Sequence, residues 1–97
     1  MSVHTLKRQA NSEEHKGKLL NIQSGWDTPC SWYYMVVMDG DEILYSNLND
    51  SKCLAFQQLS YFVELLKDRF GIEMPAKMID DIENDRNQSR MSHYKEH

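Results

Sequence analysis

The residues best placed by type and spacing to do chemistry lie in an acidic stretch near the C-terminal end of the chain. From Asp81, oxygen-bearing side chains recur at every second position as far as Ser89, as ligands do in an EF-hand calcium loop. The sixth position of such a loop is Arg86 where the bend needs glycine, and the twelfth is Ser92 where calcium needs a bidentate glutamate. We interpret the stretch as the solvated acidic face of a helix, with a recognition surface for a basic partner as the alternative.

The chain also holds two cysteines and four histidines, which together could ligate a metal or supply a nucleophile. Cys30 and Cys53 lie far apart in the sequence, and the histidines fall in its two polar ends, at positions 4, 15, 93 and 97. Because no two of these residues have the spacing of a zinc motif, we expect no metal site and no cofactor. We interpret Cys53 as a small, partly buried side chain, with a thiol activated by a helix dipole as the alternative.

The sequence shows no recognisable arrangement of catalytic residues. It has no serine–histidine–aspartate or cysteine–histidine arrangement, and its glycines are scattered instead of gathered into a phosphate-binding loop. Asp27 beside Trp26 could be a carboxylate in an apolar setting, as general acids are. A single aspartate within GWDTP is, however, typical of a turn residue. We therefore expect that the protein is not an enzyme.

Aromatic residues are the most informative feature that remains. Half of them lie between positions 26 and 45, namely Trp26, Trp32, Tyr33, Tyr34 and Tyr45. Tryptophan and tyrosine are enriched at protein interfaces because they combine a large apolar area with a polar group. The alternative is that these side chains fill a small core.

Local patterns predict the elements that must position these residues. Alternating apolar and polar residues predict a half-buried strand over residues 18–24. Turn-forming residues and a proline separate it from residues 32–38, whose β-branched and aromatic types predict a second strand. Asp39-Gly40 predicts a tight turn into a third strand over residues 42–46. We expect a three-stranded antiparallel β-meander with residues 32–38 in its centre.

Two C-terminal helices should follow the strands. Apolar residues recur at spacings of three and four along residues 55–70, which is typical of an amphipathic helix. A polar residue among positions 49–51 can cap its start, and Gly71 suits a left-handed end. Pro75 favours the first turn of a second helix over about residues 75–87. The expected fold class is α+β, in the order βββαα, with both helices packed on one face of the sheet.

The two ends of the chain lack sustained periodicity and are rich in polar residues. We expect a flexible N-terminal arm over residues 1–16, a single domain over residues 17–87 and a polar C-terminal tail over residues 88–97. A core of roughly 70 residues buries only about 60% of its unfolded surface, so oligomerisation or a partner would stabilise it. Sparse cysteines and the lack of a signal peptide or membrane-spanning stretch favour a cytoplasmic protein.

Charge argues against phosphate-containing partners. The net charge is −4, and residues 19–51 contain no Lys or Arg while holding Asp27, Asp39, Asp41, Glu42 and Asp50. The predicted sheet should therefore repel nucleic acid. An aromatic sheet face can stack RNA bases, but the basic RNP pattern that accompanies such stacking is absent here. We expect no nucleic-acid partner and no membrane.

The predicted central strand is apolar on both alternating sets of residues, so something must cover each face. The helices should cover one set, either the one that begins at Trp32 or the one that begins at Tyr33, and a one-residue register shift exchanges the two. The other set remains available for contact. A free strand edge, at residues 18–24 or 42–46, could also receive a strand from a partner or from a second copy.

These observations predict a small non-enzymatic protein-binding or regulatory module that acts through its aromatic sheet face or a sheet edge. Its partner is another protein or a second copy in a homodimer. The expected contact residues are Trp26, Trp32, Tyr34 and Tyr45, with Asp41 and Glu42 selecting against acidic partners. The alternative is a small acidic inhibitor that mimics nucleic acid and blocks a DNA- or RNA-handling protein, for which the net charge is modest.

Overall fold

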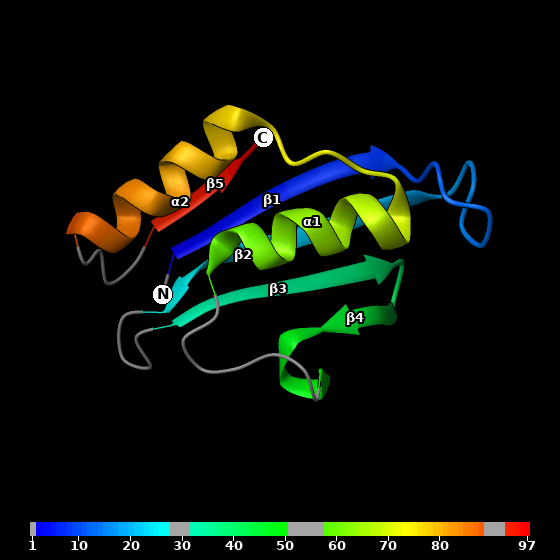
Figure 1. Cartoon of the computed structure of the whole chain (residues 1–97), viewed down its shortest axis with the longest axis horizontal. Coiled ribbons are helices and arrows are strands. Elements are labelled where there is room, and N and C mark those ends of the chain that lie inside the picture. Colours follow the sequence, from blue (N-terminus) through cyan, green and yellow to red (C-terminus); the bar gives the residue numbers. More distant parts are fainter. Residues whose placement is uncertain (1, 28–31, 51–57, 89–92) are drawn as a thin grey trace.

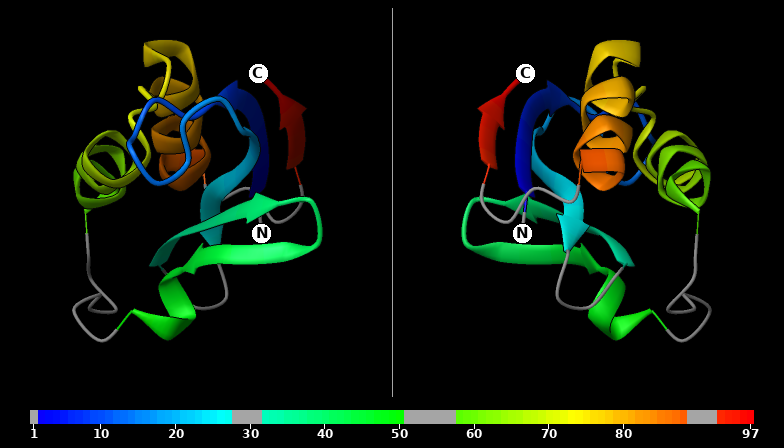
Figure 2. Two further views of the ribbon diagram at one scale, coloured as in Figure 1. Left: turned by 90° about the vertical axis from the view of Figure 1, so that its right-hand side faces the viewer. Right: turned by 90° about the vertical axis from the view of Figure 1, so that its left-hand side faces the viewer.

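A computed structural model describes residues 2–27, 32–50, 58–88 and 93–97 of the chain. These residues form a five-stranded sheet with two helices on one of its faces (Figures 1 and 2). The elements, in chain order, are β1 (Ser2–Gln9), β2 (Leu19–Asp27), β3 (Trp32–Asp39), β4 (Glu42–Ser46), the 3-10 turn η1 (Asn47–Asn49), α1 (Leu59–Phe70), α2 (Ala76–Gln88) and β5 (His93–Glu96). Neither helix of this described part is long and apolar enough to cross a bilayer.

The sheet is mixed, with the strand order β4-β3-β2-β1-β5. Neighbouring strands pair antiparallel except β1 and β5, which pair parallel. The α+β class is confirmed, and so is the succession of three strands and two helices within the predicted domain. The three-stranded meander is wrong, because each end of the chain contributes a further strand.

β1 is the first element that the sequence patterns miss. Residues 1–16 are predicted to be a flexible arm, yet Ser2–Gln9 form a strand that lies between β2 and β5. Ser2, His4 and Leu6 are buried and alternate with more exposed residues, so β1 has the period of a half-buried strand. Two of these three inward residues are polar, which is why hydrophobic periodicity does not reveal the strand.

The C-terminal tail, predicted to be polar and frayed, contributes the outermost strand. β5 pairs parallel with the N-terminal half of β1. The backbone N–H of His97 extends this pairing by donating to the carbonyl of Thr5 at 2.8 Å. A segment that is distant in the sequence therefore supplies the hydrogen bonds of a strand that has no hydrophobic pattern of its own.

The other strands lie where they are predicted in the sequence, but their order in the sheet differs from the prediction. β2 continues through Gly25–Asp27, which the sequence places in a loop, and it lies at the centre of the sheet instead of at an edge. β4 is an edge strand, as predicted. The tight turn after β3 is confirmed, since Gly40 has a φ of 58° and Asp39 pairs with Glu42.

α1 is confirmed as an amphipathic helix, although it starts later than predicted. It begins at Leu59, directly after Gln58. Of the three predicted capping positions, Asn49 is instead the last residue of η1, and Asp50 follows it directly. The third, Ser51, and the first residues of the predicted helix lie outside the described residues.

Gly71 ends α1 in the left-handed conformation, as predicted, with a φ of 64°. Its N–H donates to the carbonyl of Lys67, which satisfies one of the unpaired groups of the last turn. A Cβ at this position would lie 2.7 Å from the backbone carbonyl carbon of Asn11, so close approach also demands glycine. α2 then begins after Pro75, whose carbonyl accepts the N–H of Ile79.

The core lies between the helices and one face of the sheet. α1 packs over β3, and α2 packs over β1 and β2. The set of β3 residues that begins at Tyr33 faces the helices and is buried, whereas the set that begins at Trp32 faces away. The apolar core residues with 0% exposure are Leu20, Ile22, Met35, Val37, Phe62, Leu66, Met78 and Ile82.

Phe62→Ala should destabilise the protein by about 3–5 kcal/mol, because the change leaves a large cavity beneath α1. Urea unfolding followed by circular dichroism measures this loss. Glu64→Ala on the exposed side of the same helix is the control and should change the free energy of unfolding by no more than about 0.5 kcal/mol. Equal, small losses in both variants would contradict the packing of α1 on the sheet.

Candidate functional site

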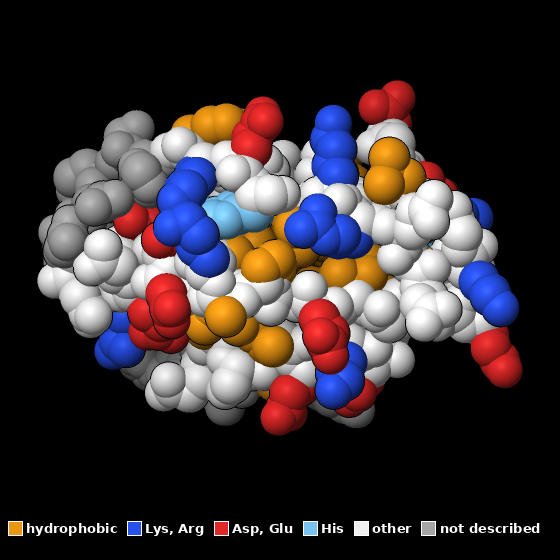
Figure 3. All heavy atoms as spheres, turned by 90° about the horizontal axis from the view of Figure 1, so that it is seen from above, with side chains coloured by type: hydrophobic (Ala, Val, Ile, Leu, Met, Phe, Trp, Pro, Cys, Tyr) orange, Lys and Arg blue, Asp and Glu red, His pale blue; other side chains and the backbone are white. Residues whose placement is uncertain are grey.

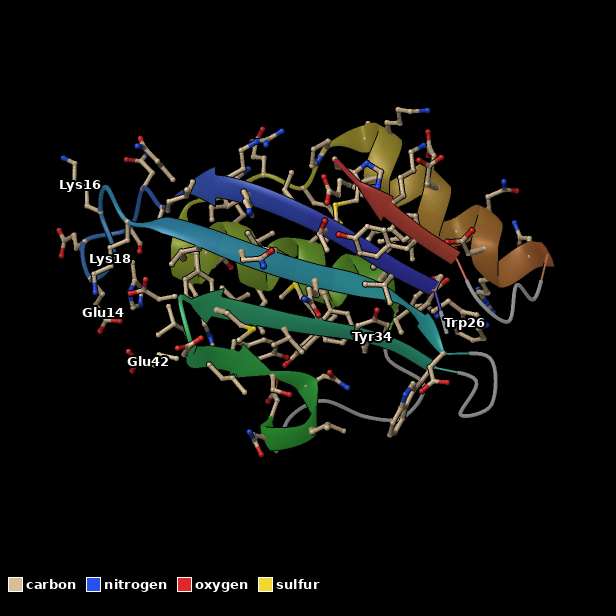
Figure 4. The ribbon with its side chains drawn as sticks, turned by 180° about the vertical axis from the view of Figure 1, so that it is seen from behind. Glu14, Lys16, Lys18, Trp26, Tyr34 and Glu42 are labelled. Atoms are coloured by element: carbon tan, nitrogen blue, oxygen red, sulfur yellow. The ribbon has the colours of Figure 1, made fainter. Side chains whose placement is uncertain are left out.

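The open face is the side of the sheet that points away from α1 and α2, and Figure 4 views it directly. It is made of the outward residues of four strands, each at least partly exposed. They are Val3 and Thr5 of β1, Asn21 and Gln23 of β2, Trp32, Tyr34, Val36 and Met38 of β3, and Tyr94 and Glu96 of β5. No helix of the described residues covers this face, so it is the first place to seek a binding surface.

Two hollows lie on the open face. The first, called the apolar pocket, is lined by Asp27, Trp32, Tyr34, Val36, Ser46, Asn47 and Leu48. The second, called the polar pocket, is lined by Thr5, Lys7, Asn21, Gln23, Tyr94, Glu96 and His97. The apolar pocket therefore sits at the start of β3 beside η1, while the polar pocket lies over β1, β2 and β5.

Tyr34, a predicted contact residue, forms one wall of the apolar pocket and also ties three strands together. It pairs with Gly25 on β2, and its hydroxyl donates to the carbonyl of Ser2 on β1 at 2.6 Å. A Cβ on Gly25 would lie 2.2 Å from that same carbonyl oxygen, so the crossing requires glycine. Burial and the nearby Asp27 raise the pKa of Tyr34 to about 12, so its hydroxyl keeps its proton throughout the neutral range.

Trp32 is the second predicted contact residue that lines the apolar pocket, and Leu48 of η1 completes its apolar wall. Leu48 is 75% exposed, the most of any large apolar side chain in the described residues. Sequence patterns predict Trp32 as a contact residue but not Leu48, because a single leucine between two asparagines carries no periodic signal. Its position becomes informative only once η1 places it next to β3.

Trp26, also predicted as a contact residue, lies on the opposite side of the sheet. Its ring packs edge-on against Tyr33 at 5.0 Å between centroids, and the Arg86 guanidinium lies 5.5 Å from its centre. Tyr33 in turn donates to a carboxylate oxygen of Glu83 on α2 at 2.8 Å. Trp26 therefore joins the sheet to α2 and is not part of the open face.

Tyr45 is likewise placed on the helix side, where it is 6% exposed. Its hydroxyl donates to Asp50 at 2.8 Å, and the hydroxyl of Tyr61 donates to the same carboxylate oxygen at 2.7 Å. Arg69 of α1 stacks over the Tyr45 ring at 5.6 Å. These contacts fasten the edge strand β4 to α1, which is a structural role.

Asp41 and Glu42, predicted to select against acidic partners, are both exposed at the turn between β3 and β4. This turn follows the end of β3, whereas Trp32 stands at its start, so the two acids lie at the far end of the strand from the apolar pocket (Figure 4). The acidic residue that does line the pocket is Asp27. The six predicted contact residues therefore do not form one continuous surface.

A buried polar cluster between β1, α2 and β5 is the group that sequence reasoning misses. His4 Nε2 lies 2.5 Å from Asp85 Oδ2, and His4 Nδ1 lies 2.8 Å from His97 Nε2. Asp81, one helical turn before Asp85, binds Lys95 at 2.6 Å. The acidic face of α2, expected to be solvated, is thus partly buried. The i,i+4 spacing of Asp81 and Asp85 was the one local signal for it.

The thiol hypothesis stays a prediction, because Cys30 and Cys53 both lie outside the described residues. Comparisons of the chain with protein-family models, with curated proteins and with solved structures gave no match. A functional assignment must therefore be argued from the geometry of the described residues.

Tyr34→Phe should lower the free energy of unfolding by about 1 kcal/mol, because it removes the hydrogen bond from β3 to β1. The raised pKa also means that the folded state favours the neutral phenol. Its stabilising effect is therefore complete below about pH 10 and is lost as the pH rises towards 12. We expect the Phe variant to lose less stability than the wild type across that interval.

The control is Tyr94→Phe, which alters an exposed tyrosine whose hydroxyl contacts Glu96 on its own strand. Thermal melts at pH 8, 10 and 11 would make the comparison. If both variants behaved alike, Tyr34 would not tie the strands together.

Proposed function

We propose that this chain is a small non-enzymatic protein-binding or regulatory module that receives an extended, basic segment of a partner protein. The segment would dock over the apolar pocket and against the neighbouring part of β3 that pairs with no strand of the described residues. The observation that carries the proposal is the coincidence, at one place, of an apolar pocket, a stretch of β3 that pairs with no strand of the described residues, and the carboxylate of Asp27.

The pocket offers the kind of anchor site that dominates binding energy at protein interfaces. Trp32, Tyr34 and Leu48 line it, and tryptophan and tyrosine are over-represented among residues whose removal weakens binding most. Tyr34 is held rigidly by its bond to β1, so little side-chain entropy is lost when a partner covers it. An apolar side chain of the partner would fill the hollow between these three residues.

The edge beside the pocket can accept a further strand. β4 pairs with β3 only from Val36 to Asp39, so residues 32–35 of β3 have no strand on that side within the described part of the chain. Asn47 closes this edge partly, since its side-chain oxygen accepts the N–H of Met35 at 3.3 Å. Strand addition supplies backbone hydrogen bonds, and a pocket for alternate side chains supplies specificity.

Charge favours a basic partner over a second copy of the chain. Asp27 lines the pocket, and residues 19–51 contain no Lys or Arg. A two-fold symmetric dimer through this face would bring the same acidic residues of both copies together. A partner segment with Lys or Arg beside an apolar residue would instead complement Asp27.

Contacts within the chain weigh against the alternative of an acidic nucleic-acid mimic. Asp50 accepts two tyrosine hydroxyls, Asp81 pairs with Lys95 and Asp85 pairs with His4. These carboxylates are occupied within the fold, so they do not form a regular free array in the described residues. We therefore prefer the apolar pocket as the site of action.

Selection of a random peptide library displayed on phage against the immobilised full-length chain would test the proposal. We expect the enriched peptides to carry an apolar residue flanked by Lys or Arg. Leu48→Ser should weaken their binding at least tenfold, as measured by fluorescence polarisation, because it removes an exposed apolar wall of the pocket.

Leu19→Ser is the matched control, because Leu19 is an exposed leucine, 59% accessible, that does not line the pocket. Its affinity for the peptides should equal that of the wild type. Asp27→Asn should weaken binding more at low salt than at high salt. Equal affinity of the selected peptides for the Leu48→Ser and Leu19→Ser variants would overturn the proposal. A dimer that sediments as such in the wild type and dissociates on Leu48→Ser would show that a second copy occupies the face.

A further inference from the structure

The buried polar cluster brings together donor atoms from three elements that are remote in the sequence. His4 comes from β1, Asp81 and Asp85 from α2, and His97 directly follows β5. Ligand atoms of His4, Asp81 and His97 all lie within 4.8 Å of one another. His4 and Asp85 are buried, whereas Asp81 and His97 are partly exposed. Figure 3 shows histidine atoms at the surface with Lys or Arg side chains beside them. The cluster is thus buried on one side and accessible on the other.

Asp85 fixes the orientation of the His4 ring. An ionised carboxylate only accepts hydrogen bonds, so His4 Nε2, at 2.5 Å from Asp85, carries the proton of that contact. In the neutral ring this leaves a lone pair on Nδ1, which points at His97 Nε2 at 2.8 Å. A metal-bound histidine characteristically donates its other ring N–H to a carboxylate in this way.

We propose that His4 Nδ1, His97 Nε2 and a carboxylate oxygen of Asp81 bind one divalent transition-metal ion, zinc being the ion best suited to them. A proton now bridges the two ring nitrogens, and the metal would take its place. Zinc binds histidine nitrogen at about 2.0–2.1 Å, which sets two such nitrogens about 3.3 Å apart in a tetrahedral site. The rings therefore need to separate by roughly half an ångström.

The surroundings favour such a movement. His97 is partly exposed, so its ring can shift without disturbing the core. Its Nε2 already lies within hydrogen-bond distance of His4 Nδ1, so only a small shift separates the present arrangement from one that admits an ion. Three protein ligands leave one tetrahedral position for water.

Lys95 is the group that competes with the metal. Its ammonium binds Asp81 at 2.6 Å, and it lowers the pKa of that carboxyl. An incoming cation must share the carboxylate with Lys95 or displace it. Lys95 therefore sets the affinity, and a neutral residue in its place should strengthen metal binding.

Metal binding would have a structural consequence, because its ligands come from different strands and from α2. β5 has four residues, and its sheet partner is β1. A metal held by His97 and by residues of β1 and α2 would clamp β5 in place. Any ion that binds the folded state alone stabilises it, so zinc should raise the melting temperature.

The first experiment is titration of the metal-free full-length chain with Co²⁺, followed by visible absorption, and with Zn²⁺, followed by calorimetry. We expect one ion per chain and the absorption of tetrahedral cobalt. His97→Gln should abolish both signals. Asp85→Asn should weaken binding by about 10–100-fold, because Asp85 does not touch the ion but orients its ligand His4. Lys95→Met should strengthen binding.

Controls separate this site from other donors. His15→Gln removes a histidine remote from the cluster and should leave the affinity unchanged. A Cys30→Ser, Cys53→Ser double variant should also bind as the wild type does. Loss of binding in the cysteine variant, or equal binding by His97→Gln and the wild type, would overturn the proposal. So would the lack of any zinc-induced rise in melting temperature.

Discussion

A buried imidazole–carboxylate pair, His4 with Asp85, holds β1 against α2, and the rest of the sheet depends on where β1 lies. β1 supplies the parallel partner of β5, and its first residue, Ser2, accepts the hydroxyl of Tyr34. It also leads to Asn11, whose N–H donates to the carbonyl of Phe70 at the end of α1. Hydrogen bonds to charged groups contribute about 1.5–3 kcal/mol, and this contribution adds to the backbone pairing of β1 with β2 and β5.

The elements whose own residues carry a signal could be predicted. The apolar stripe predicts α1, and Gly71 predicts the left-handed end of that helix. Asp39-Gly40 predicts the tight turn between β3 and β4. All three features are confirmed. β1 and β5 could not be predicted, because most of their inward positions are polar, among them Ser2 and His4 of β1 and Lys95 of β5. Ser2 and His4 are buried by partners on β2 and α2 that no local window contains.

The candidate site shows the same division. The aromatic residues predicted to make contacts lie on β2, β3 and β4, and the two faces of the sheet separate them. Trp32 and Tyr34 lie on the open face, while Trp26 and Tyr45 join the sheet to the helices. Successive residues of a strand point to opposite faces of the sheet. The set that faces outward is therefore decided by which face the helices cover, and this depends on tertiary packing and not on the local sequence. Leu48 and the histidine cluster depend on contacts between distant segments, and sequence spacing does not encode them.

Amide hydrogen exchange, measured residue by residue by NMR, tests most directly whether β1 is an interior strand of the sheet. If β1 is an interior strand held by His4 and Asp85, its amides should exchange as slowly as those of β2 and β3, and far more slowly than those of the loop around Lys16. Exchange of residues 2–9 at the rate of an unfolded arm would contradict it.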